Sequence, residues 1–420
     1  MVFKRLPESK KSFSYNGQQL TGDVTAGIIA AFLLLPQSMA YAQIAGVPVT
    51  MGLYAAAIPP IIYAFIGSSR YLSIGPVSIV SLLSFSGISS IADNNEASFI
   101  ELVILLAFIV GVIQILLGTL RFGTFFHYIP ASLIRGFITA VALIIIFNQL
   151  DVLLGVSLSV YQNFFSHFVE IILHFKEIHL LTAGIGLGSI FLLKICKKLI
   201  KPSPGPFIVI LISILLVDYF SWDELGVNVV GSITRGEIVF TFLYPEWKTL
   251  LMLMPLGLVI SLISFGESYA VARSLDEKAG ESKNLSPNRE LIGLGSANMT
   301  SSIFGAIPVA GAISRSAVAY QSGAKTKLAL LITSGFMLLS IYFITPLFYY
   351  LPQAALAAII IVAVSSLISV REFLEDCRYN RNDAAVFLIT FLAVIFVDVL
   401  LGFIIGILFS ISVRCLIKNA

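Results

Sequence analysis

Long apolar stretches with almost no charge recur along the whole chain, and they limit what it can fold into. Residues 99–120 carry a single charge, Glu101, and residues 249–272 carry only Glu267. A helix needs about 20 apolar residues to cross the hydrocarbon core of a bilayer, so these stretches predict membrane-spanning helices. Of all residues 58% are apolar and 12% charged, too few charges to cover soluble domains of this length. This composition excludes a cytosolic enzyme.

Segments bounded by charged residues, Gly or Pro predict an all-α polytopic membrane protein with fourteen spans. A short N-terminal segment, 1–21, precedes a first set of seven spans over 22–220. A polar linker, 221–248, separates it from a second set over 249–420. The predicted spans are 22–45, 51–67, 76–91, 99–120, 130–154, 180–200, 206–220, 249–272, 288–305, 311–321, 328–347, 352–369, 383–397 and 398–417.

Basic residues fall mostly on one side of these spans. If the N-terminus is cytoplasmic, so is the cluster of lysines from Lys194 to Lys201 and the arginines from Arg371 to Arg381. The excess of Lys and Arg in cytoplasmic loops then predicts that both chain ends are cytoplasmic and that the linker is extracellular. We expect a multi-pass protein of the inner or plasma membrane. Asp23, near the start of the first span, is expected to cap that helix.

The two halves carry traces of an internal repeat. Residues 37–42 (QSMAYA) parallel 267–272 (ESYAVA), and the third and tenth spans are both short and opened by Gly and Pro, at 73–76 (SIGP) and 307–311 (IPVAG). Seven is an odd number, so two consecutive copies have opposite orientations in the membrane. We therefore predict a seven-plus-seven inverted repeat whose third and tenth spans are half-helices that meet near the midplane.

Two facing half-helix N-termini favour an anion, because each presents N–H groups and about half a positive charge. The tenth half-helix adds Ser314 and Arg315, and the third begins with Pro76, Val77 and Ser78, which are small enough for close backbone approach to a ligand. An arginine at this depth needs a partner or an aqueous cavity. A structural ion pair is the alternative for Arg315, and ordinary helix packing is the alternative for the serines.

Glu267 is a second ionisable residue inside a span. Burial disfavours a charged carboxylate while a nearby arginine favours it, so Glu267 is a candidate for exchanging a proton. The repeat places Gln37 opposite Glu267, and Tyr41 follows one turn later, so both are candidate donors to the same cavity. Interhelical hydrogen bonding for Gln37 and Tyr41, and a structural ion pair of Glu267 with Arg315, remain alternatives. We predict no catalytic residues, no metal and no cofactor, because no Walker loop, HExxH, GxSxG or Cys/His cluster is present.

Several motifs make this sequence closely similar to the SulP anion transporter family, the sulfate permeases of bacteria and plants. The motifs are LPQSMAYA at 35–42, GVP at 46–48, GLY at 52–54, GSSR at 67–70, SIGP at 73–76, SRSAV at 314–318 and GAKT at 323–326.

The resemblance implies the fourteen-helix fold of uracil permeases, divided into a core domain (about 22–120 and 249–347) and a gate domain (about 130–220 and 352–417). It implies that the core moves against the gate like an elevator. Its anion site falls on Gln37, Tyr41, the Pro76–Val77 end of the third helix and Ser314–Arg315, and an acid is similarly placed at Glu267 in proton-coupled members. Homodimers are also implied. Family members usually continue into a cytoplasmic STAS domain, whereas this sequence ends at Ala420.

We therefore expect a secondary active transporter that takes up sulfate with a proton through Glu267. Bicarbonate and dicarboxylate are close rivals as substrates. Sodium coupling is less favoured, because the positions that carry hydroxyl ligands in sodium-dependent bicarbonate members hold Val271 and Ile313 here. An uncoupled exchanger or channel, a nucleobase carrier, and a structural or signalling membrane protein are the remaining alternatives.

Overall fold

The structure is a computed structural model of the chain. Residues 1–16 of the predicted N-terminal segment and 232–245 of the predicted linker lie outside the part it describes. The described residues are 17–89, 91, 96–123, 130–156, 164–199, 205–231, 246–280, 285–343, 345–397 and 399–419.

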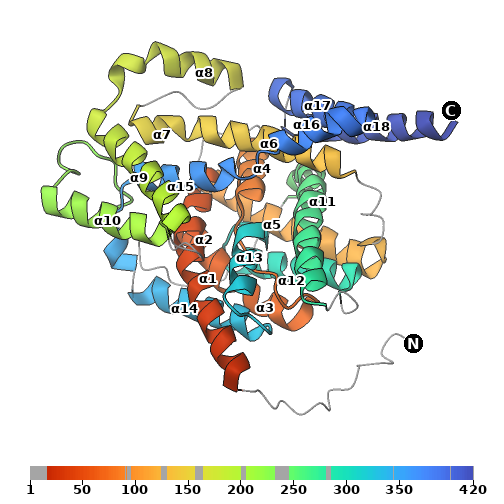
Figure 1. Cartoon of the computed structure of the whole chain (residues 1–420), viewed down its shortest axis with the longest axis horizontal. Coiled ribbons are helices and arrows are strands. Elements are labelled where there is room, and N and C mark those ends of the chain that lie inside the picture. Colours follow the sequence, from red (N-terminus) through yellow and green to blue (C-terminus); the bar gives the residue numbers. More distant parts are fainter. Residues whose placement is uncertain are drawn as a thin grey trace.

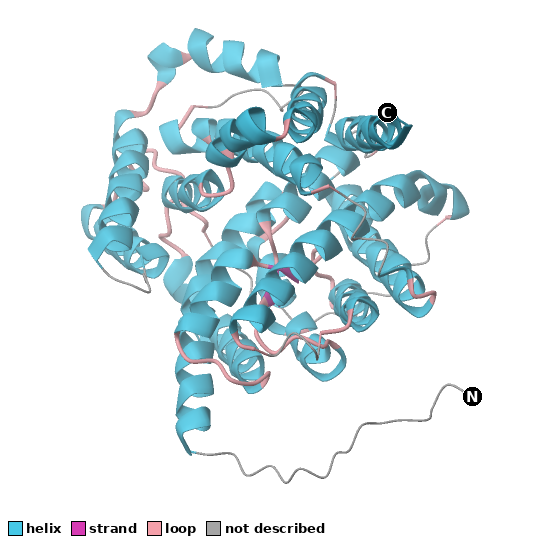
Figure 2. Cartoon of the chain, turned by 45° about the vertical axis from the view of Figure 1, so that its right-hand side comes forward, coloured by secondary structure: helices cyan, strands magenta, loops and turns pink. Residues whose placement is uncertain are grey.

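The described chain is almost entirely helical, with one pair of very short strands in its interior (Figure 2). Its elements, in order, are α1 (Gly17–Ile44), α2 (Val49–Ala57), α3 (Pro59–Ile66), β1 (Ile74–Gly75), α4 (Ser78–Ser89), α5 (Glu96–Thr119), α6 (Ala131–Asn148), α7 (Leu150–Leu154), α8 (Phe164–Leu173), η2 (Phe175–Glu177), α9 (Leu180–Leu199), α10 (Gly205–Phe220), α11 (Trp247–Lys278), α12 (Pro287–Ile303), β2 (Ala310–Gly311), α13 (Ile313–Gln321), α14 (Leu328–Phe343), η4 (Thr345–Phe348), α15 (Gln353–Ser365), α16 (Val370–Tyr379), α17 (Arg381–Phe396) and α18 (Val399–Asn419).

The helices are those of a membrane protein. Within the described ranges, seven helical segments are long and apolar enough to cross a bilayer, and four shorter apolar helices accompany them. The expected helical membrane architecture is therefore confirmed. The long segments are Gln19–Ile44, Val49–Ile66, Ser98–Thr119, Ser132–Leu154, Leu180–Leu199, Trp247–Lys278 and Gln353–Tyr379.

Two details differ from the sequence prediction. Asp23 does not cap the first helix, because α1 begins earlier, at Gly17. Its carboxylate instead accepts hydrogen bonds from the backbone N–H groups of Lys325 and Thr326 and from the Thr326 hydroxyl, which ties α1 to the turn before α14. The basic stretch from Arg371, expected as a loop, contains the amphipathic helix α16.

The helices pack in two groups that each contain both halves of the chain (Figure 1). In one group α5 packs along α12 and α11, and α1 packs along α14, α2 and α13. In the other, α6 packs against α17, and α15 packs against α9 and α7. The two groups meet where α1 contacts α15 and α10, and where α4 contacts α6. Elements from distant parts of the sequence therefore build each group.

Glycines allow the close contact between α5 and α12. A Cβ added to Gly295 would lie 2.7 Å from the Gly111 carbonyl oxygen, and one added to Gly111 would lie 2.8 Å from the Gly295 carbonyl oxygen. The two backbones thus touch without an intervening side chain. Small residues at such contacts are typical of membrane helices, where packing rather than the hydrophobic effect drives association.

Replacing Gly295 with Ala is expected to lower the free energy of unfolding by about 1–3 kcal/mol, because the new methyl group would overlap backbone atoms that have no room to move. The measurement is the thermal unfolding midpoint of the purified protein in detergent. Gly335→Ala is the matched control, because a Cβ there meets nothing within 4 Å. Equal midpoints for the two variants would contradict this account of the α5–α12 contact.

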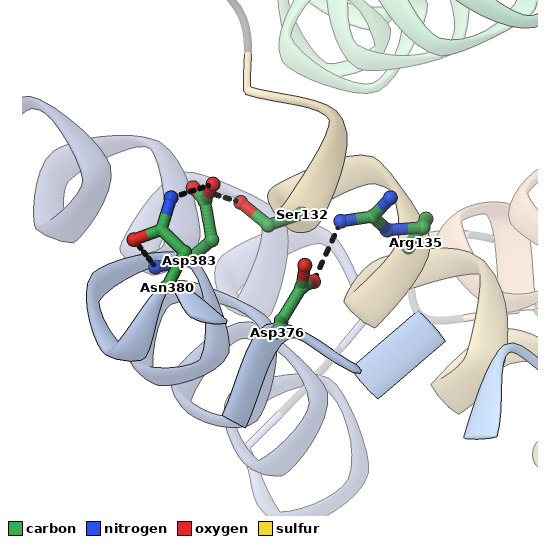
Figure 3. Close-up of polar contacts among 5 residues, drawn as sticks. All are labelled: Ser132, Arg135, Asp376, Asn380 and Asp383. Carbon is green, nitrogen blue, oxygen red and sulfur yellow. Dashed lines mark hydrogen bonds and ion pairs between the residues drawn. The ribbon is translucent and has the colours of Figure 1, made fainter. Parts of the chain in front are cut away.

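A polar cluster joins α6, α16 and α17 at one end of the second group (Figure 3). Nη2 of Arg135 lies 2.6 Å from Oδ2 of Asp376, and the Ser132 hydroxyl donates to Oδ1 of Asp383 at 2.9 Å. The Asn380 amide donates to the other oxygen of Asp383 at 2.6 Å, and its own oxygen accepts the Asp383 N–H at the start of α17. The cluster fixes the amphipathic helix α16 against two neighbouring helices.

A double-mutant cycle on Arg135→Ala and Asp376→Ala is expected to give a coupling free energy of up to about 1 kcal/mol, because this pair is only partly exposed to solvent. Unfolding midpoints of the four proteins supply the cycle. The pair Arg371–Glu375, in which both side chains are exposed, is the control and should show weaker coupling. Additive effects at Arg135 and Asp376 would mean that the ion pair does not hold α16.

Candidate functional site

Two helices begin close together in the interior of the molecule. β1 pairs with β2 in antiparallel fashion, with Ile74 opposite Gly311 and Gly75 opposite Ala310. α4 begins at Ser78 shortly after β1, and α13 begins at Ile313 shortly after β2. The first N–H groups of a helix lack intrahelical partners, and Ala312, which precedes α13, has no side chain that could cap them. Both helix starts therefore offer N–H groups and partial positive charge to this region.

Arg315, in the first turn of α13, is completely buried. Its Nη1 donates to the carbonyl oxygen of Pro76 at 3.0 Å and to Oε1 of Gln37 at 3.3 Å. Its Nε and Nη2 have no hydrogen-bond partner among the described residues. Gly75 allows this close approach, because a Cβ there would lie 3.1 Å from Nη2. A buried guanidinium with unused donors requires an acceptor, and a carboxylate or oxyanion is the strongest kind.

A cavity of about 510 Å³ lies beside these helix starts, and six of the predicted site residues line one wall of it. Gln37 and Tyr41 come from α1, Glu267 from α11, and Ser314 from α13. Val77 and Ser78 come from the start of α4. The cavity lining does not include Arg315 or Pro76. Arg315 is buried in contact with Gln37 of this wall, and Pro76 contributes its carbonyl oxygen to Arg315.

The opposite wall comes from α9, α10 and α15, and sequence reasoning did not select it. Apolar side chains dominate this wall, and apolar residues inside spans carry no signal that distinguishes a cavity from packing. The sequence marks Lys197 only as a member of the basic cluster from Lys194 to Lys201. The residues are Leu193, Lys197, Gly205, Pro206, Ile359, Val362, Ala363, Ser366 and Leu367.

Glu267 is nearly buried, and its Oε2 has no hydrogen-bond partner. No ion pair found among the described residues joins Glu267 to Arg315. Glu267 thus lines the cavity and Arg315 lies behind it against Gln37, and the two do not neutralise each other by direct contact. Within the described ranges, no group of three His, Cys, Asp or Glu side chains is placed to hold a metal ion.

Comparison with known proteins identifies the family. Residues 20–390 match the sulfate permease family. The chain belongs to that family.

Two relatives show how far the similarity extends. Sulfate transporter 4.1, chloroplastic, of Arabidopsis thaliana is 36% identical over 400 residues, which cover 93% of this chain and 57% of the relative. A probable sulfate transporter of Mycobacterium tuberculosis is 31% identical over 397 residues, 94% of this chain and 70% of the relative. The chain thus spans less than two thirds of the plant relative's length.

Solved structures share the fold at lower sequence identity. Murine Solute Carrier 26 family member A9, in an inward-facing state, superposes with a TM-score of 0.89 at 23% identity, over 96% of this chain and 69% of that one. The transmembrane domain of the cyanobacterial bicarbonate transporter BicA gives 0.78 at 20% identity, over 94% of this chain and 98% of that one.

Proposed function

We propose that this chain carries a small oxyanion, sulfate, across a membrane together with a proton. The observation that carries the proposal is Arg315, a fully buried cation in contact with Gln37 of the cavity wall and close to two helix starts. Two of its guanidinium nitrogens have no hydrogen-bond partner among the described residues. A buried charge without a partner is costly, so the site is suited to an anion that supplies the missing acceptors.

Sulfate fits the chemistry of this wall. It has acceptor oxygens on all sides and no donor at neutral pH. The wall offers the hydroxyls of Tyr41, Ser78 and Ser314 and helix N–H groups, and Arg315 is buried in contact with Gln37 of this wall. A neutral nucleobase would leave the cation uncompensated. The names of the two relatives above, both sulfate transporters, support the same substrate.

Glu267 is the proposed proton-coupling residue. Its carboxyl group is nearly buried at the same cavity, and one oxygen has no hydrogen-bond partner. A proton on Glu267 would remove a negative charge that otherwise repels the anion. Binding of the proton and of sulfate would then favour each other, which is the requirement for symport.

The proposed architecture is a seven-plus-seven inverted repeat with α4 and α13 as half-helices near the midplane. Its support is that β1–α4 and β2–α13 repeat one pattern, and that Gln37 and Glu267, matched by the repeat, line one cavity. Both chain ends are proposed to be cytoplasmic, the linker 221–248 extracellular, and the protein a homodimer in the plasma or inner membrane.

An elevator movement is the proposed mechanism, with core domain 22–120 and 249–347 and gate domain 130–220 and 352–417. The group built on α1 and α5 provides the polar wall of the cavity, and the group built on α9 and α15 provides a mostly apolar one. A polar site can slide along an apolar surface without breaking hydrogen bonds to it. Internal ties such as Asp23–Thr326 and Arg135–Asp376 keep each group together as it moves.

The test is uptake of labelled sulfate into proteoliposomes that hold this chain, with and without an inward proton gradient. Sulfate uptake that the gradient stimulates is expected, with weaker competition by bicarbonate and fumarate. Uptake of another anion without sulfate would overturn the substrate, and absence of any anion flux would overturn transport by this chain.

Glu267→Gln is expected to abolish stimulation by the gradient, because a glutamine stays neutral at all pH values and cannot release a proton. Sulfate exchange between the two sides should persist, since no net proton movement is needed for it. Glu277→Gln, on the exposed end of the same helix, is the matched control and should behave as wild type. Gradient stimulation that survives in Glu267→Gln would exclude Glu267 as the coupling residue.

Arg315→Lys is expected to raise the KM for sulfate by about tenfold or more, because lysine keeps the charge but lacks the planar fork of donors. Arg371→Lys, at an exposed position, is the control. A wild-type KM in Arg315→Lys would show that sulfate does not contact this guanidinium. An uncoupled channel instead predicts flux that does not saturate with sulfate.

A further inference from the structure

The segment that leads into α13 is extended, although it lies in the interior of a membrane protein. Ile307, Val309 and Ala310 are completely buried. Extended backbone at such depth is tolerated only where protein groups satisfy its N–H and C=O groups. Helical hydrogen bonds are unavailable to this segment, so other partners must hold it.

Side chains from α11 and α12 supply many of those partners. Asn298 forms hydrogen bonds with both backbone groups of Val309: its Oδ1 accepts the N–H at 2.7 Å, and its Nδ2 donates to the C=O at 3.1 Å. The Ser301 hydroxyl donates to the carbonyl oxygen of Ile307. The Ser268 hydroxyl accepts the N–H of Gly311 at 2.8 Å. These bonds hold both ends of the extended segment.

A second layer of bonds orients Asn298. Its Nδ2 also donates to Oε1 of Gln114 at 3.0 Å, and Nε2 of Gln114 donates to the Ser264 hydroxyl at 2.9 Å. Gln114, Asn298 and Ser264 are all completely buried. Gln114 is a long polar side chain in the apolar helix α5, where it would be costly without these partners.

This chain of bonds also connects the two charged residues of the site. Ser268 follows Glu267 on α11 and holds Gly311, four residues before Arg315. Asn298 holds Val309 in the middle of the segment, and Gln114 joins Asn298 back to α11 through Ser264. The position of Arg315 relative to Glu267 is therefore tied to these side chains, none of which lines the cavity.

We infer that Gln114, Asn298 and Ser268 are positioning residues: they hold the extended segment so that Arg315 and the start of α13 meet the anion. The inference rests on the proposed function for the identity of the anion. It extends the site to α5 and α12, neither of which contributes a side chain to the cavity.

The experiment compares three variants of the full chain. Gln114→Leu keeps the size of the side chain but removes both of its hydrogen bonds. Gln114→Glu, neutral when buried, keeps an acceptor for Asn298 and a donor for Ser264. Thr300→Val is the matched control on α12, because within the described ranges the Thr300 hydroxyl bonds only to the Ser296 carbonyl oxygen of its own helix.

Two readouts are taken on folded protein, selected by size-exclusion chromatography. The KM and maximal rate of sulfate uptake measure how well the site works. Hydrogen–deuterium exchange of residues 305–316 measures, without any substrate, how firmly the extended segment is held. Gln114→Leu is expected to raise the KM about tenfold with a smaller change in maximal rate, and to speed exchange in this segment. Gln114→Glu and Thr300→Val should resemble wild type.

The inference would be overturned if Gln114→Leu left the hydrogen–deuterium exchange of residues 305–316 unchanged. It would also be overturned if exchange became faster while the KM for sulfate stayed at the wild-type value. A loss of activity that follows only the amount of folded protein, with the KM unchanged, would show a merely structural role. If wild-type protein takes up no sulfate, the proposed function fails. The exchange data then decide alone: faster exchange confined to 305–316 upholds the positioning role, and unchanged exchange rejects it.

Discussion

Satisfying extended backbone inside a membrane is the constraint on which the rest of this structure depends. Only helices satisfy their own polar groups in lipid, so two short strands in the interior need partners from several surrounding helices. β1 and β2 pair with each other, and Ser316 accepts the N–H of Ser73 to hold the approach to β1. As a result, α4 and α13 begin in the interior of the protein, and their first residues line the cavity.

The charge at the site follows from the same arrangement. Arg315 can be buried because a carbonyl oxygen of the other lead-in, that of Pro76, and the amide oxygen of Gln37 share its Nη1. The remaining donors stay available, and the acid on α11 lies at the cavity without closing on them. Such a site carries two costs, a buried cation with unused donors and a buried acid with an unpaired oxygen, and the proposed binding of an anion together with a proton would relieve both.

Sequence reasoning found the polar residues of the candidate site because charged and amide residues stand out in apolar spans, as Arg315, Glu267 and Gln37 do. It could not find the partners of Asn298, since Gln114 is 184 residues away and only helix packing brings them together. Asp23 was misassigned for a similar reason: a carboxylate near a span looks like a local cap, and nothing in the sequence points to the backbone of Lys325. The apolar wall formed by α9 and α15 could not be predicted, because the sequence does not distinguish Leu, Val and Ile side chains that line a cavity from those that pack in the core.

The glycine contact between α5 and α12 has a consequence for how the molecule can deform. Carbonyl oxygens of α5 lie against the backbone of α12 and the reverse, so the two helices form one closely packed unit built from distant parts of the chain. Close backbone contact of this kind opposes sliding of α5 along α12, two helices that come from different halves of the sequence. In the proposed elevator movement, the displacement would therefore run along the contact between the two helix groups rather than between the two halves of the sequence.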